Sequence, residues 1–258
     1  MIRAIGVAVP ARDEVTSIGA CLGSIADAAA ATTVPVVVVV AADSCTDDTA
    51  DTARRSGDEH GLDLDVVTCR YGSAGLARKH AAGHLIERLG THGCSPASTW
   101  IACTDADTTV PEDWLDRQLA WAAHGFDAVA GLVDLPLDAP VELRAAFHDA
   151  VQEVGARYGH RHVHGANLGI RLSALVAAGG FPDVELGEDH ALWGRLARSS
   201  ARILGATDTT VVTSGRLVGR TAGGFAAFLT ELNENLREPV VRQSAGVEAG
   251  RSTARRNG

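Results

Sequence analysis

Two aspartates with one small residue between them follow an apolar stretch, in the segment Trp100–Asp107 (WIACTDAD). The apolar residues Trp100–Thr104 predict a buried strand, so that Asp105 and Asp107 stand at its carboxyl end. Open α/β sheets bind ligands in the crevice at this end of their strands. The pair offers hard oxygen ligands, and Mg²⁺ favours one or two carboxylates together with substrate phosphates. The alternative is a pair that caps the helix expected after Pro111.

A second acidic pair, Glu188 and Asp189, follows Gly187 at the start of a helix expected over residues 188–199. The helix dipole and nearby amides hold a carboxylate ionised at such a position. Asp189 is therefore a candidate general base toward a hydroxyl, with Glu188 as the second candidate. Carboxylates in a first helical turn can also be dipole partners and nothing more.

Two arginines spaced by four, Arg216 and Arg220, precede a glycine-rich segment. They could close over a diphosphate as charge-assisted hydrogen-bond donors. A solvated surface pair is the alternative interpretation.

The first half of the chain must position the strand-end residues. Aliphatic runs predict strands over residues 2–9, 34–42, 62–69 and 100–104, and helical spacing predicts helices over 15–29, 49–59 and 76–89. Asp13 is the expected N-cap of the first helix. This alternation predicts a parallel, doubly wound α/β sheet whose strand ends gather on one rim.

In the second half, helices are expected over residues 114–124, 142–158, 188–199 and 223–235, and strands over 128–135, 165–170, 201–206 and 209–213. No linker divides the chain, so we expect one domain over 1–240, with a nucleotide-binding half of about 1–110 and an acceptor half of about 111–240. Residues 241–258 have the composition of a disordered tail.

Three alternating histidines, His160, His162 and His164, would share one face of a strand. No fourth ligand stands at a recognised spacing, which disfavours a zinc site.

The composition excludes several classes of partner. The formal charge is −9, and no basic face gathers Lys and Arg, so nucleic acid is not expected to bind. No apolar run reaches the ~18 residues of a membrane span, and the first residues do not form a signal peptide. The five cysteines are scattered without CxxC spacing, which favours reduced thiols and a cytoplasmic location.

Five landmarks occur in a fixed order along the chain: VPARDE at 9–14, DSCTDDT at 43–49, Ala77–Arg78, Asp105–Asp107, and the glycine-rich stretch from Gly179 to Asp189. Their order and spacing resemble those of family 2 glycosyltransferases of the GT-A fold, over roughly residues 2–215. The resemblance implies a single GT-A domain with a mostly parallel, Rossmann-like twisted sheet flanked by helices. It also implies metal-dependent transfer of a sugar from a UDP- or GDP-sugar to a hydroxyl of a small or soluble acceptor.

The resemblance assigns expected roles to individual residues. Those that would line the nucleotide are Pro10, Arg12, Glu14, Asp43, Arg78 and Asp105. Asp105 and Asp107 would hold Mg²⁺ or Mn²⁺, which offsets the charge of the leaving diphosphate as a Lewis acid. Asp189 would be the general base of an inverting transfer, and Gly165–Asn167 would form part of the sugar and acceptor pocket.

Two departures from the family pattern leave alternatives open. Ala42 stands where the family often has an acidic residue, and no histidine follows His190 to complete a metal shell. Waters or one of the three alternating histidines would have to complete it. A non-catalytic nucleotide-sugar binder is therefore an alternative. A retaining GT-A transferase is another, because several of those share the early motifs. A nucleotidyltransferase is disfavoured, because Pro10–Glu14 lacks the glycines of its phosphate loop.

Overall fold

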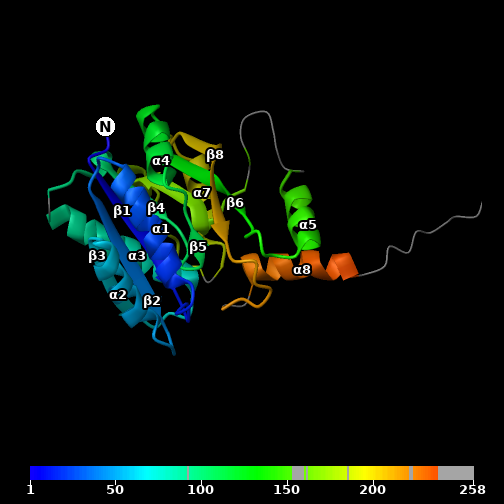
Figure 1. Cartoon of the computed structure of the whole chain (residues 1–258). Coiled ribbons are helices and arrows are strands. Elements are labelled where there is room, and N and C mark those ends of the chain that lie inside the picture. The colour runs from blue at the N-terminus through cyan, green and yellow to red at the C-terminus, as the bar shows by residue number, and fades with distance from the viewer. Residues whose placement is uncertain (92, 153–159, 161, 185, 221–222, 238–258) are drawn as a thin grey trace, which may run out of the picture.

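The computed structural model describes residues 1–91, 93–152, 160, 162–184, 186–220 and 223–237. Eight strands of this part of the chain form one sheet in the order β3-β2-β1-β4-β7-β6-β8-β5 (Figure 1). The strands are β1 (Ala4–Ala11), β2 (Val36–Asp43), β3 (Leu64–Cys69), β4 (Thr99–Cys103), β5 (Thr108–Thr109), β6 (Ala128–Asp134), β7 (Leu168–Arg171) and β8 (Ile203–Thr213). The α-helices are α1 (Ile18–Ala31), α2 (Thr49–His60), α3 (Ala74–Thr91), α4 (Trp114–Ala123), α5 (Val141–Gln152), α6 (Leu172–Ala177), α7 (Glu188–Ala197) and α8 (Phe225–Arg237). Short 3₁₀ helices cover Pro96–Ser98 and Gly165–Asn167.

The first half has the expected parallel arrangement. β1 lies between β2 and β4 and pairs in parallel with both, and β3 adds in parallel to β2. Both faces of β1 are covered, because Val7 and Val9 pack in the core layer that includes α1, while Ala8 packs in the layer of α3. Burial on both faces explains why these strands read as continuous aliphatic runs. The carboxyl ends of β1, β2 and β4 consequently share one rim of the sheet.

The second half is mixed rather than uniformly parallel. β7 pairs antiparallel with β4 and β6, β8 runs parallel to β6, and β5 pairs antiparallel with β8. The two strands expected over 201–206 and 209–213 form the single strand β8, whose register with β6 shifts between Ala130 and Leu132. Such an irregularity bends a strand without ending it. The strand expected over 165–170 begins only at Leu168, after a 3₁₀ turn.

The expected cap of the first helix is wrong. Ser17, not Asp13, precedes α1, and the carboxylate of Asp13 instead accepts hydrogen bonds from the backbone N–H and hydroxyl of Thr46, at 2.7 and 3.0 Å. Asp13 has φ 51°, a left-handed conformation that a short polar side chain tolerates. Its side chain therefore joins the loop after β1 to the loop after β2.

Helices α5 and α8 lie beside each other at the side of the molecule away from β3 (Figure 1). They enclose a small apolar cluster of their own, formed by Leu135, Leu143, Phe147 and Leu229. The end of the helix expected over 142–158 and the expected tail lie outside the described residues. Among the described residues, no helix combines the length and the apolar character needed to cross a membrane.

Candidate active site

A cavity of about 640 Å³ opens at the carboxyl ends of β1, β2 and β4. The predicted site residues that line it are Pro10, Arg12, Glu14, Asp43, Arg78, Asp105, Asp107, Gly165, Glu188, Asp189, Arg216 and Arg220. They come from strand ends, from the first turns of α3 and α7, from the 3₁₀ turn that begins at Gly165, and from the loop after β8. A parallel sheet places ligands at this rim, and the helix starts add N–H groups and carboxylates to it. The predicted pocket residue Asn167 does not border the cavity, because its side chain is buried and its amide donates to the backbone carbonyls of Leu132 and Thr209.

Arg78 joins the acidic groups of the two sequence halves. Its guanidinium forms ion pairs with Asp105, at 2.5 Å, and with Glu188, and Arg78 is only 2% exposed. Burial acts to lower the pKa of Arg78, but the negative charges of Asp105 and Asp189 outweigh it and raise the pKa above its ordinary value. Because Arg78 stays protonated, its two ion pairs hold the side chains of Asp105 and Glu188 in place.

A second arginine joins the acidic groups on the other side of the cavity. Arg216 contacts Oε1 of Glu14 at 2.6 Å and Oδ2 of Asp107 at 3.0 Å, and Arg220 lies 3.6 Å from Glu14. Glu14 is only 4% exposed and also accepts a hydrogen bond from the Ser17 hydroxyl. Both arginines therefore line the cavity in contact with carboxylates, Arg216 half-buried and Arg220 exposed at its edge.

The short strand β5, which sequence reasoning missed, places Arg216 beside Asp107. The hydroxyl of Thr108 donates to that of Thr213 at 2.8 Å, and the Ser214 N–H donates to the Asp107 carbonyl at 3.2 Å. A two-residue strand carries almost no periodicity, so no pattern in the sequence marks it.

The negative charge of Asp107 is only partly compensated by its ion pair with Arg216. Burial, together with the negative charge of Asp105, raises the pKa of Asp107 to about 6, although Arg216 acts to lower it. Each of the two strand-end aspartates uses one oxygen in an arginine contact, Oδ1 in Asp105 and Oδ2 in Asp107. A partly buried, carboxylate-only donor set with excess negative charge fits a hard divalent cation such as Mg²⁺ or Mn²⁺.

Asp189 is oriented by backbone amides. Its Oδ2 accepts from the N–H of Gly165 at 2.9 Å, and its Oδ1 accepts from the N–H of His190 at 2.7 Å. Gly187, at φ 72°, turns the chain sharply into α7 just before it. The side chain is half-buried and lines the cavity, where its free lone pairs can accept a proton from a hydroxyl.

Asp43 at the end of β2 holds the loop that leads into α3. Its two carboxylate oxygens accept from the backbone N–H groups of Tyr71, at 2.6 Å, and Ser73, at 2.9 Å. The side chain is 2% exposed and still borders the cavity. It fixes the first turn of α3, and with it the position of Arg78.

The histidines do not converge as metal ligands would. The rings of His160, His162 and His164 stack at centroid distances of 6.0 and 6.1 Å, and the Nε2 atoms of His160 and His162 contact the backbone carbonyls of Ala206 and Val151. His162 and His164 line the cavity. Parallel rings present faces rather than nitrogen lone pairs to one another.

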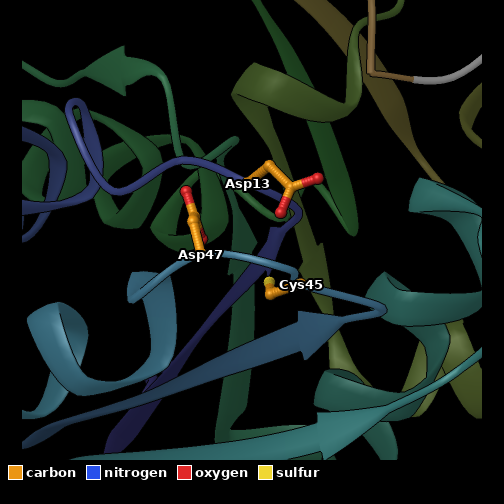
Figure 2. Close-up of side chains that lie close together, drawn as sticks. All are labelled: Asp13, Cys45 and Asp47. Carbon is orange, nitrogen blue, oxygen red and sulfur yellow. The ribbon is translucent and has the colours of Figure 1, made fainter.

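A separate group, Asp13, Cys45 and Asp47, lies on the loops after β1 and β2, with ligand atoms within 4.8 Å of one another (Figure 2). Thr46 donates to Asp13, and Val15 and Thr49 donate to Asp47. Burial raises the pKa of the Cys45 thiol, which keeps it protonated and a poor ligand. These hydrogen bonds join the loop after β1 to the loop after β2, which explains why the three side chains lie close together. None of the three borders the cavity.

Sequence reasoning missed the aromatic side of the cavity. Phe147 from α5 and Phe225 and Phe228 from α8 line it. The i, i+3 spacing of Phe225 and Phe228 in an amphipathic helix was the available signal, but that spacing equally marks a helix packed on a core.

The comparisons with known proteins agree with this fold. The profile of the glycosyltransferase like family 2 matches residues 3–215. A search of curated proteins found no match to the sequence. Among solved structures, S. aureus TarS (residues 1–349) in complex with UDP-GlcNAc matches with a TM-score of 0.63 and 16% identity, over 86% of this chain and 61% of that one.

The mannosyltransferase PcManGT from Pyrobaculum calidifontis, in complex with GDP-Man and Mn²⁺, matches with a TM-score of 0.58 and 24% identity, over 81% of this chain and 56% of that one. The chain thus spans about three fifths of the length of these structures, which share its fold. Because the family profile covers most of the sequence and the sheet is that of the GT-A structures, the chain belongs to the glycosyltransferase like family 2.

Proposed function

We propose that the protein is a metal-dependent glycosyltransferase that moves a sugar from a nucleoside-diphosphate sugar to an acceptor hydroxyl, with inversion. The observation that carries the proposal is that Asp105, Asp107 and Asp189 face one cavity and that Arg78 links the two ends of it. The end with Asp105 and Asp107 could hold a diphosphate leaving group through a bound cation. The end with Asp189 could supply a general base to the acceptor.

The nucleotide end is formed by the rim of β1, β2 and β4. Pro10, Arg12, Glu14 and Asp43 would line the base and ribose of a UDP- or GDP-sugar. The solved structures named above support this class of donor, since TarS was crystallised with UDP-GlcNAc and PcManGT with GDP-Man.

The diphosphate requires positive charge in a protein of formal charge −9. Asp105 and Asp107 would hold Mg²⁺ or Mn²⁺, which when bound offsets the charge developing on the diphosphate. Arg216 and Arg220 lie at the same end. They would give up their ion pairs with Glu14 and donate charge-assisted hydrogen bonds to the phosphate oxygens instead.

The acceptor end contains the base. Asp189 would take the proton of the acceptor hydroxyl as that oxygen attacks the anomeric carbon from the face opposite the diphosphate. The N–H groups of Gly165 and His190 hold the carboxylate in one orientation for this step. Glu188 would act through Arg78, as a positioning residue rather than as the base.

Calorimetry tests the nucleotide and metal assignments together. UDP and GDP are titrated into the wild type and Asp107→Ala, each with and without Mn²⁺. The wild type is expected to bind one of them with Mn²⁺, and the variant to lose that dependence while it remains folded. Asp58→Ala, the same change at an exposed position of α2, serves as the control and should bind like the wild type. Equal Mn²⁺-dependent binding by Asp107→Ala would remove Asp107 from the metal site.

A further inference from the structure

One wall of the cavity is apolar and aromatic. It consists of Phe147, Ala150 and Val151 from α5 and Phe225, Ala226 and Phe228 from α8, which we call the apolar wall. The three rings meet edge-on or tilted, with centroid distances of 5.7, 6.3 and 6.4 Å. The chain has five phenylalanines, so three of the five are gathered on this one surface. The phenylalanine side chains of the candidate active site are therefore all on this wall.

The apolar wall begins beside the candidate base. The ring of His164 packs against the edge of Phe225, with centroids 5.8 Å apart, and the next residue, Gly165, donates its N–H to Asp189. Burial lowers the pKa of His164 to about 4, so its ring is uncharged at neutral pH. The ring that connects Asp189 to the apolar wall is therefore uncharged.

The apolar wall comes from other elements than the nucleotide end. Figure 1 shows α5 and α8 on the side of the molecule away from β2 and β3, whereas Pro10 and Asp43 belong to β1 and β2. The wall contains both buried and accessible rings, because Phe147 is 1% exposed and Phe228 is 37% exposed. Such a surface can bind a ligand without rearranging the core behind it.

We propose that the acceptor carries its reactive hydroxyl on a neutral molecule with an apolar alkyl or aryl group, and that this group lies on the apolar wall. The proposal rests on the proposed function, since Asp189 defines the acceptor end. It narrows the acceptor class: a phosphorylated or carboxylated acceptor would place its charge against six uncharged side chains, which offer it no compensation. Burial of apolar ligand surface on the rings supplies the binding energy instead.

The neutral fluorescent probe N-phenyl-1-naphthylamine tests the wall without knowledge of the donor. The full chain is expected to bind it saturably at one site. Phe228→Ala should weaken that binding by about fivefold to tenfold, and Phe228→Leu should retain most of it. Phe126→Ala, the same truncation at a ring that packs under Arg202 outside the cavity, is the control and should bind like the wild type. Melting temperatures establish that each variant is folded.

Competition identifies the ligand class. Octyl glucoside, kept below its micelle concentration, should displace the probe, whereas methyl glucoside should not. The proposal is overturned if the probe does not saturate, if Phe228→Ala binds it like the wild type, or if both glucosides compete equally. It is also overturned if size-exclusion chromatography shows a dimer that excludes the probe, because the wall would then be an interface between copies. Failure of the proposed function shows separately, as loss of nucleotide binding in calorimetry.

Discussion

The guanidinium of Arg78 lies against the Cα of Gly165, in space that any side chain at position 165 would occupy. A Cβ at that position would stand 2.5 Å from Cζ of Arg78. Gly165 also donates the N–H that orients Asp189. Because Gly165 has no side chain, it leaves room for Arg78, which pairs with Asp105. Its N–H also orients Asp189, the candidate base.

Gly165→Ala should consequently disturb both ends of the site. We expect displacement of Arg78, loss of nucleotide affinity, and destabilisation of about 1–3 kcal/mol from overpacking. Urea denaturation and calorimetry measure the two effects. Gly83→Ala in α3 is the matched control, because nothing lies within 4 Å of the added Cβ, and it should stabilise the helix by about 0.5–1 kcal/mol. Normal nucleotide binding by Gly165→Ala would contradict the role given to this contact.

Asp107 is expected to reduce the stability of the protein in the absence of a cation. Its pKa is about 6 in the folded protein, above the ordinary value of 3.8, so folding favours its protonated form. The resulting penalty is complete above pH 6 and disappears as the pH falls through 6 toward 3.8. Asp107→Asn should therefore raise the free energy of unfolding at pH 8, on the order of 1–3 kcal/mol.

The gain from Asp107→Asn should shrink as the pH is lowered from 8 toward 4, and Mn²⁺ should stabilise the wild type but not the variant. Urea denaturation at several pH values, with and without Mn²⁺, measures both effects. A variant less stable than the wild type at pH 8 would mean that the Arg216 ion pair outweighs the burial of the carboxylate.

The early strands and their terminal residues could be read from the sequence because local and global preferences agree there. A strand buried on both faces is continuously aliphatic, and polar residues at its end have few other places to go. Asp43 and Asp105 lie at the cavity for this reason, whereas the position of Arg78 in α3 was expected from the family resemblance. Their partners could not be foreseen, because the pairing of Arg78 with Glu188 joins residues far apart in the chain through the packing of α7.

The second half was harder to predict because its elements are short or interrupted. The turn at Gly165–Asn167 and the two-residue β5 have no period that a sequence pattern can display. Asp13 illustrates a different failure, since its position favours a helix cap but the neighbouring loop offers it stronger donors at Thr46. A tertiary contact with Thr46 therefore outweighed the local preference of Asp13 for a helix cap.

Asp43→Asn should affect the site through the loop that leads into α3. An amide can accept only on its oxygen, so one of the N–H groups of Tyr71 and Ser73 would face an NH₂ group. We expect destabilisation of about 1–3 kcal/mol and weaker nucleotide binding. Hydrogen exchange of the Tyr71 and Ser73 amides should accelerate in the variant. Unchanged exchange together with altered base preference would instead assign Asp43 to base contact alone.

Asp189→Asn separates a catalytic role from a structural one. The amide keeps the shape of the side chain and can accept one of the two hydrogen bonds from Gly165 and His190, but it cannot take a proton from the acceptor. A general base contributes about 10²–10⁴-fold to the rate, so turnover should fall by at least 10²-fold while nucleotide binding in calorimetry barely changes. A structural role predicts the reverse: stability would fall, because one of the N–H groups of Gly165 and His190 would face an NH₂ group, and transfer by the folded variant would survive.

Transfer to octyl glucoside or, failing that, hydrolysis of the donor by water provides the rate for this comparison. Asp183→Asn, an exposed residue paired with Lys79 and outside the cavity, is the control and should turn over like the wild type. Glu188→Gln should lower stability as well as rate, because it leaves the buried Arg78 with one fewer counter-charge. Near-wild-type transfer by Asp189→Asn would show that Asp189 is not the general base. Tight nucleotide binding without any transfer by the wild type would favour a non-catalytic nucleotide-sugar binder.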